Sequence, residues 1–214
     1  MSFRVGFCIS GAGRLARTAI QHSAALGIEP AVLLVTNRAM ADLEKLGASF
    51  GIPTVRIDYT DRKAADEELT NASIGARLDL LCLTYDKIIP APLIEHYEGK
   101  IFNVHPALLP AFRGMNAVRQ ALCARPCFSG VTIHEVDKEV DHGSVICQGV
   151  EPILESDTEE ALACRLYNLM RPMYLQVISW YREGRVLRNS GGIRIQGARY
   201  GSLPISPAIE RAFP

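Results

Sequence analysis

The sequence carries no excess charge of either sign. Its 214 residues include 23 lysines and arginines and 23 aspartates and glutamates, so the formal net charge is zero. Proteins that bind nucleic acids or anionic membrane surfaces through general electrostatic attraction are usually basic. The balanced charge therefore gives no reason to expect a nucleic acid or a membrane surface as the partner.

The sequence also lacks a leader segment, a long apolar run and paired metal-ligand patterns. Met1 to Arg4 lead directly into a strand-like segment, unlike a signal peptide. No hydrophobic stretch approaches the roughly 20 residues that a membrane-spanning helix needs. Only Cys123 and Cys127 of the six cysteines lie close together, and one such pair is a poor metal signature. We therefore expect no bound metal, and reduced, buried thiols in a cytoplasmic protein.

Short apolar segments alternate with helical patterns through the first half of the chain. Strands are predicted at 4–9, 31–35, 54–57, 78–83 and 101–104, and helices at 15–26, 40–50, 61–74 and 93–97. Because strands and helices alternate, the predicted class is α/β, with a Rossmann-like, doubly wound, mostly parallel sheet.

The pattern changes after residue 114. A helix is predicted at 116–124, a β pair at 130–136 and 144–150, and a long helix at 158–181 with Asp157 as its N-cap. A hairpin is predicted from 185–187 and 193–195. The fold thus adds a C-terminal antiparallel β element and a long helix. We expect a catalytic domain over 1–187, followed by a hairpin and an irregular tail over 188–214.

Two polar side chains stand at the end of the strand 101–104. Asn103 and His105 are two residues apart, and alternating strand side chains place such a pair on the same side. Pro106 and Pro110 then end regular structure and stiffen the following loop. The pair presents a neutral donor and a titratable group to one small volume.

The glycine loop Gly11-Ala12-Gly13 follows the first strand and admits three interpretations. A dinucleotide site also needs an acidic residue at the end of the second strand, where the sequence has Thr36-Asn37-Arg38. An anion site at the following helix N-terminus needs only free N–H groups and the helix dipole. A plain tight turn is the third interpretation.

Three motifs occur in an order that resembles the folate-dependent formyltransferases, and within them the glycinamide ribonucleotide transformylase branch. They are Asn103–Pro110 (Asn-x-His-Pro-x-Leu-Leu-Pro), Gly114–Leu122, and Gly130–Gln148 with Asp141-His142-Gly143. The resemblance implies transfer of a formyl group from 10-formyltetrahydrofolate to the primary amine of a small anionic metabolite, as in purine biosynthesis. It implies that Asn103, His105 and Asp141 are catalytic.

These three residue types suit acyl transfer. An oxyanion forms when the amine attacks the formyl carbon, and the amide of Asn103 can donate to it. His105 can relay the proton, because its ordinary pKa of about 6.5 lies near working pH. Asp141 would favour the charged imidazole. His134 matches a family histidine near the folate loop, and either a supporting or a purely structural role is open to it.

The resemblance also implies binding residues. The cofactor-binding positions are Arg62, Tyr85, Lys87, Ile88, Ile89, Asn103, Val140 and Asp141, with Arg62 matching a basic contact for the glutamate tail. The substrate-binding positions are Gly11, Gly13, Arg14, Leu15 and Met170. Three of the latter depart from the family pattern: Arg14 and Leu15 stand where it has small polar residues, and Met170 where it has an acidic one.

These departures leave the acceptor open between glycinamide ribonucleotide, an amino sugar and another primary amine. Three further alternatives remain open: a formyltetrahydrofolate hydrolase, a non-catalytic folate- or anion-binding module, and a dinucleotide-dependent oxidoreductase. The oligomeric state also stays open, with a homodimer as one alternative.

Overall fold

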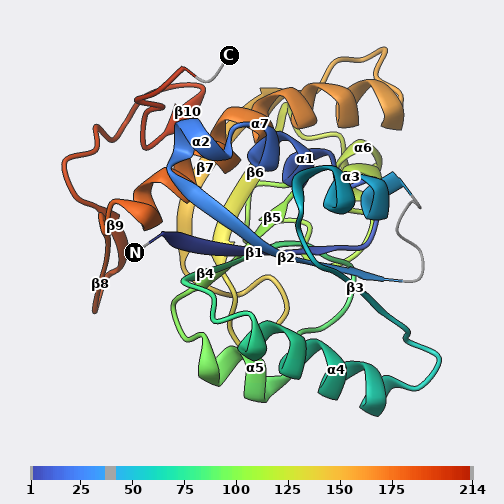
Figure 1. Ribbon diagram of the computed structural model, residues 1–214. Coiled ribbons are helices and arrows are strands. Elements are labelled where there is room, and N and C mark those ends of the chain that lie inside the picture. The colour runs from blue at the N-terminus through green and yellow to red at the C-terminus, as the bar shows by residue number, and fades with distance from the viewer. Residues whose placement is uncertain (1, 37–41, 213–214) are drawn as a thin grey trace. The chain divides into compact units, whose positions relative to one another are not determined.

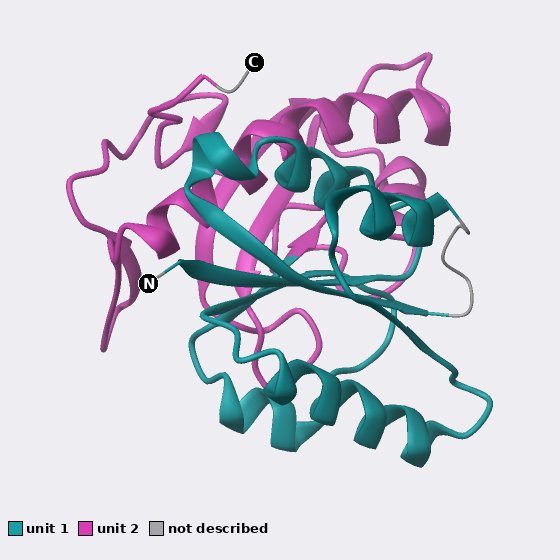
Figure 2. Cartoon of the chain, viewed as in Figure 1, with its two compact units in different colours: residues 1–103 teal, residues 104–214 magenta. Residues whose placement is uncertain are grey.

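The computed structural model describes residues 2–36 and 42–212. Asn37 and Arg38, which bear on the dinucleotide interpretation, lie outside the described residues. The chain forms two compact units, residues 1–103 and 104–214, each with its own secondary structure (Figure 2).

Unit 1 contains a parallel sheet in the order β5-β4-β1-β2-β3. Its strands are β1 (Phe3–Ile9), β2 (Ile28–Thr36), β3 (Thr54–Ile57), β4 (Leu80–Thr84) and the first three residues of β5 (Ile101–His105). The last five residues of β1 are all buried, as expected for a strand between two parallel neighbours. The strand order reverses between β1 and β4, so the doubly wound arrangement predicted from the sequence is confirmed.

Helices cover both faces of this sheet, as Figure 1 shows. The helices α1 (Arg14–Gln21), α2 (Ser23–Leu26) and α3 (Asp42–Phe50) lie on one face, and α4 (Arg62–Gly75) and α5 (Ala91–His96) on the other. The single helix predicted over 15–26 is two helices, because the backbone leaves helical geometry at His22 (φ −100°, ψ 12°). The carboxylate of Asp61 caps α4 by accepting from the Lys63 and Ala64 N–H groups.

Unit 2 is built on antiparallel strands and one long helix. The strands β6 (Phe128–Glu135), β7 (Val145–Pro152) and β10 (Ile205–Ser206) pair in the order β6-β7-β10. The helices are α6 (Ala117–Ala124) and α7 (Glu159–Arg182), and β8 (Val186–Asn189) pairs with β9 (Gly192–Ile195) as a hairpin. Gly149 lets α7 pack closely on β7, since an added Cβ there would lie 2.8 Å from Leu169.

The start of α7 corrects one prediction. The N-cap is Thr158, whose hydroxyl accepts from the Ala161 N–H, and not Asp157. Asp157 instead accepts from the Leu154 N–H and from both terminal nitrogens of Arg165. Both residue types cap helices well, so sequence could not decide between two neighbours. The helix then continues through Pro172 to Arg182.

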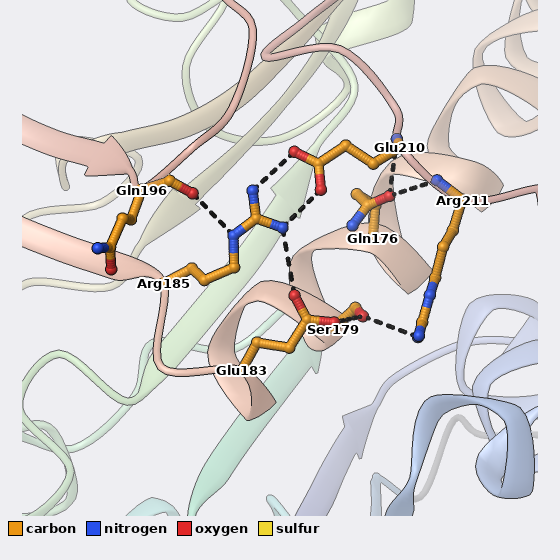
Figure 3. Close-up of polar contacts among 7 residues, drawn as sticks. All are labelled: Gln176, Ser179, Glu183, Arg185, Gln196, Glu210 and Arg211. Atoms are coloured by element: carbon orange, nitrogen blue, oxygen red, sulfur yellow. Dashed lines mark hydrogen bonds and ion pairs between the residues drawn. The ribbon is translucent and has the colours of Figure 1, made fainter.

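The C-terminal segment is fixed by polar contacts to α7 and the hairpin (Figure 3). The side-chain oxygen of Gln176 accepts from the backbone N–H groups of Glu210 and Arg211, at 3.0 Å each. The carboxylate of Glu210 pairs with Arg185, which also donates to the Gln196 carbonyl. The segment also contributes β10 to the sheet, so more of it is ordered than an irregular tail implies. The division of the chain at residue 187 remains a prediction.

The thiols divide into two groups, which corrects the expectation that they are buried. Cys8, Cys82 and Cys147 are buried. The exposed thiols are Cys123 on α6, Cys127 in the loop before β6, and Cys164 on α7. Burial raises the pKa of Cys147 to about 12. Within residues 2–36 and 42–212, no helix is long and apolar enough to cross a membrane, and no three His, Cys, Asp or Glu side chains are grouped to hold a metal ion.

Candidate active site

The carboxylate of Asp141 is the centre of the polar site in unit 2. Asp141 lies in the loop between β6 and β7, and its side chain is only 8% exposed. One carboxylate oxygen accepts from the Gly114 N–H at 2.8 Å and lies 3.2 Å from Nδ1 of His105. The other oxygen lies 3.5 Å from Nε2 of His134. The structure thus brings His105 and Asp141, 36 positions apart by their numbers, into direct contact.

The proton pattern of His105 follows from its two partners. Its Nε2 lies 2.8 Å from the Phe112 carbonyl oxygen, which can only accept, so Nε2 carries the hydrogen. Nδ1, which faces Asp141, is therefore the nitrogen that can gain or lose a proton. Burial lowers the pKa of His105, and the Phe112 carbonyl and the Asp141 charge offset this only in part. His105 is thus neutral at neutral pH and can accept a proton at Nδ1.

Opposing influences act on the pKa of Asp141. Burial raises it, but the His134 ring, the Gly114 N–H and the charge of His105 together hold the pKa below its ordinary value. Asp141 is consequently ionised at neutral pH. The site thus pairs an anionic carboxylate with a neutral imidazole, and a proton gained at Nδ1 would face the Asp141 charge.

Two residues at this site adopt backbone conformations that non-glycine residues usually avoid. Phe112 has φ 56° and Asp141 has φ 53°, both in the left-handed region. Such residues cost of order 1 kcal/mol or more, and they persist where surrounding contacts fix them, often at functional sites. Here the two conformations direct the Phe112 carbonyl and the Asp141 carboxylate to opposite nitrogens of the same ring.

The loop that follows His105 is held from β6 and β7. The hydroxyl of Thr132 donates to the Ala107 carbonyl at 2.7 Å and accepts from the Leu109 N–H at 3.0 Å. Gln148 donates to the Leu109 carbonyl at 3.0 Å. Thr132 is fully buried, so these bonds form in a low-dielectric interior where each counts for more. These bonds hold the loop that follows His105 in place against β6 and β7.

Gly143 is needed because two backbone segments approach each other closely there. It has no positive φ, but an added Cβ would lie 1.8 Å from the Glu135 carbonyl oxygen. Only glycine lets the loop after Asp141 pass this close to the end of β6.

His134 is placed beside Asp141, which favours a supporting role over a remote structural one. Its Nδ1 lies 2.8 Å from the Glu135 carbonyl oxygen and so carries the hydrogen. Its Nε2 is buried and has no hydrogen-bond partner among the described residues. The Phe112 carbonyl and the Gly114 N–H could not be predicted from the sequence, because any residue type supplies these backbone groups.

Unit 1 presents a second group of predicted residues at the carboxyl ends of β1 and β4. Here the Asp86 N–H donates to the Ser10 hydroxyl at 3.0 Å, joining the loops that follow the two strands. The Tyr85 hydroxyl donates to the Tyr59 hydroxyl at 3.0 Å, and Nζ of Lys87 lies 5.7 Å from the Tyr59 ring centroid. Ligands of doubly wound folds bind at such a reversal of strand order. Tyr59 was not predicted as a site residue, and it lies in the loop before α4.

The other cofactor positions differ in exposure. Ile88 is 53% exposed, whereas Ile89 is 6% exposed and belongs to the core. Asn103 is half-buried and in register with Leu83 of β4. The side chain of Arg62 is 63% exposed at the start of α4. Val140 is exposed in unit 2, next to Asp141.

The glycine loop forms the start of α1. Gly13 has φ 63° and occupies the N-cap without a side-chain cap, and the first turn of α1 holds no acidic residue. Arg14 and Gly11 are exposed, but Leu15 is buried, so only its backbone can contribute to a ligand site. In unit 2, Met170 is half-buried on α7.

Comparison with known proteins extends over most of the chain. The chain is 38% identical over 195 residues to the trifunctional purine biosynthetic protein adenosine-3 of Drosophila pseudoobscura pseudoobscura. This match covers 87% of the chain but only 14% of that protein. The chain is 34% identical over 152 residues to the phosphoribosylglycinamide formyltransferase of Bacillus subtilis, covering 69% of this chain and 78% of that protein.

Solved structures give the same result. Glycinamide ribonucleotide transformylase 1 from Symbiobacterium toebii superposes with a TM-score of 0.84 at 32% identity, covering 90% of this chain and 93% of that one. A formyltetrahydrofolate deformylase from Pseudomonas syringae has a TM-score of 0.84 at 24% identity over 91% of this chain and 66% of that one, which shows a shared fold. Residues 3–178 match the family described as formyl transferase. The chain therefore belongs to the formyl transferase family, as its three motifs predicted.

Proposed function

We propose that the protein transfers a formyl group from 10-formyltetrahydrofolate to the primary amine of a small anionic metabolite. The observation that carries this proposal is the buried pair of His105 and Asp141, whose Nδ1 and carboxylate oxygen lie 3.2 Å apart. Family membership supports it, because formyltransferases of this family take their formyl group from this folate. The relatives that match also include enzymes named for purine biosynthesis.

The residues of the site can perform each step of the transfer. The amine nitrogen forms a bond to the formyl carbon, and Asn103 donates a hydrogen bond to the resulting oxyanion. Nδ1 of His105 takes the proton that the nitrogen loses, and Asp141 stabilises the imidazolium. His105 then returns the proton to N10 of the folate as the bond between carbon and N10 breaks. No net proton is gained or lost by the enzyme.

The donor site is proposed along the loop that follows β4. Ile88 offers an exposed apolar side chain to the flat pterin ring, while Ile89 would contribute through its backbone. Tyr85 and Lys87 line the same loop, and the exposed Arg62 can meet the glutamate tail as a charge-assisted partner.

The acceptor is proposed to be glycinamide ribonucleotide or a related amine. Several relatives carry the name phosphoribosylglycinamide formyltransferase, which favours the first. Backbone N–H groups of Gly13 and Leu15 at the start of α1, with Arg14 beside them, suit an anionic group. Met170 cannot accept a hydrogen bond from an ammonium as a carboxylate would, which favours a different amine, such as an amino sugar.

The experiment that tests the proposal combines 10-formyltetrahydrofolate with a panel of primary amines and follows the released tetrahydrofolate by absorbance. We expect release to require an amine, and His105→Ala and Asn103→Ala to abolish it while circular dichroism stays native. His96→Ala, an exposed histidine at the end of α5, is the matched control and should retain activity.

Two other outcomes would replace the proposal. Release at the full rate without any amine would indicate a formyltetrahydrofolate hydrolase. The formyltetrahydrofolate deformylase that shares this fold is named for that activity. Saturable tetrahydrofolate binding with no formyl consumption would indicate a non-catalytic folate-binding module.

A further inference from the structure

Glu135, at the end of β6, is a partly buried carboxylate held by two other elements of unit 2. Its side chain is 13% exposed. The Tyr181 hydroxyl of α7 donates to it at 3.0 Å, and the Arg188 guanidinium of β8 forms an ion pair with the same oxygen. These two partners satisfy the oxygen of a carboxylate that is largely removed from solvent. Burial and the neighbouring Glu135 charge raise the pKa of Tyr181, so its hydroxyl keeps the hydrogen that it donates.

The backbone of Glu135 is fixed just as firmly on the opposite side. Its N–H donates to the Ser144 carbonyl at 2.9 Å, and its carbonyl accepts from Nδ1 of His134 at 2.8 Å. The backbone at Gly143 packs against the same carbonyl. Since neighbouring strand side chains leave opposite faces, the Glu135 and His134 side chains point apart. The backbone carbonyl of Glu135 is therefore the group that connects this residue to the His134 ring.

This bond fixes which nitrogen of His134 can meet Asp141. Because Nδ1 donates to the Glu135 carbonyl, a neutral His134 ring presents the bare Nε2 toward the Asp141 carboxylate, 3.5 Å away. That Nε2 is buried and lacks a hydrogen-bond partner within the described part of the chain. The contact between His134 and Asp141 thus depends on how the Glu135 carbonyl holds the ring.

We propose that Glu135, anchored by Tyr181 and Arg188, is a positioning residue that fixes the orientation and tautomer of His134 and, through it, the Asp141 carboxylate. The proposal rests on the function proposed above for the Asp141 site. It gives the hairpin of β8 and β9 a part in the reaction, since the hairpin carries Arg188.

A purely structural role for Glu135 would give different results. Loss of an ion pair between a hairpin and a strand would lower the melting temperature and leave the imidazole of His134 unchanged. Glu210→Gln is the matched control, because it also replaces a carboxylate paired with an arginine of this region and lies outside the His134 contacts.

The test compares wild type, Glu135→Ala, Glu135→Gln, Arg188→Ala and Glu210→Gln. Ring ¹⁵N chemical shifts of His134, assigned by its absence in His134→Gln and recorded between pH 5 and 9, report which nitrogen carries the hydrogen. We expect Glu135→Ala to move His134 toward averaged tautomers and to lower kcat about 3- to 10-fold with KM little changed. Glu135→Gln, which can still accept from Tyr181, should lie between wild type and Glu135→Ala.

Arg188→Ala should shift the His134 signals in the same direction, and the double variant with Glu135→Ala should add little further. Glu210→Gln should lower stability without moving these signals. A folded Glu135→Ala or Arg188→Ala protein with wild-type His134 ¹⁵N shifts would overturn the inference. Failure of wild type to transfer formyl to any amine would instead refute the proposed function, and the ¹⁵N test needs no activity.

Discussion

Replacing Asp141 by asparagine removes one charge and almost no volume. The Gly114 N–H can still donate to the remaining oxygen, so the loop should keep its place. At an effective dielectric constant of about 20, two unit charges 3.2 Å apart attract by about 5 kcal/mol. This attraction arises only once His105 is protonated during the reaction. Allowing for partial compensation by the polar surroundings, we expect kcat to fall about 10²- to 10³-fold, or about 3 to 4 kcal/mol.

The pH profile provides a second signature of this variant. Burial holds the pKa of His105 below its ordinary value, and Asp141 partly offsets that effect. Catalysis needs neutral Nδ1, so wild-type activity should fall as the pH drops through the lowered pKa of His105. Without the carboxylate that pKa falls further, and the acid limb should move to lower pH.

The assay is the rate of tetrahydrofolate release at saturating donor and amine between pH 4.5 and 9. Asp137→Asn is the matched control, since it makes the same chemical change in the same loop on a side chain that is 43% exposed. It should retain most of the activity and the wild-type profile. Near-wild-type kcat for Asp141→Asn, or an unmoved acid limb, would refute the assignment of Asp141 as the partner of His105.

Three further predictions concern the scaffold. Gly143→Ala should abolish most activity and lower the free energy of unfolding by about 1 to 3 kcal/mol, because the added Cβ would collide with the Glu135 carbonyl. Gly75→Ala, where the added Cβ meets open space, is the control and should change neither quantity. Thermal unfolding and the tetrahydrofolate-release assay check both variants. Gln176→Ala should lower the free energy of unfolding in urea by about 1 to 3 kcal/mol, since two backbone N–H groups of the C-terminal segment lose their acceptor, and an unchanged urea midpoint would contradict it. Bonds from Arg165 and Leu154 lower the pKa of Asp157 from 3.8 to about 2, so its stabilising effect is complete above pH 3.8 and is lost as the pH falls toward 2. Acid titration followed by circular dichroism should therefore show a shallower loss of stability over that interval for Asp157→Asn.

Sequence was sufficient to predict those parts of the fold that depend on one strong local pattern. The strands β1, β2 and β4 each contain a run of buried apolar residues, and the alternation of such runs with helical patterns was enough to predict the parallel sheet. The contact between His105 and Asp141 was predicted only through the order of three motifs. Composition alone could not have paired the last residue of β5 with a residue in the loop between β6 and β7.

The features that sequence did not predict have physical reasons. The hydrogen on Nε2 of His105 is fixed by the Phe112 carbonyl, and a backbone carbonyl has no residue-type signature. Leu15 is buried because α1 turns that face to the sheet, which motif matching cannot show. The two-residue strand β10 pairs with β7 through tertiary contacts, since so short a segment has little intrinsic preference.

The most direct test of the central claim follows a labelled formyl group. Donor carrying ¹⁴C in the formyl carbon is mixed with the protein and the amine that gives the fastest release, and the products are separated. The account predicts that the label appears on the amine nitrogen in wild type and stays on the folate in His105→Ala. Label recovered as formate in wild type, or carried to the amine at an undiminished rate by His105→Ala, would contradict it.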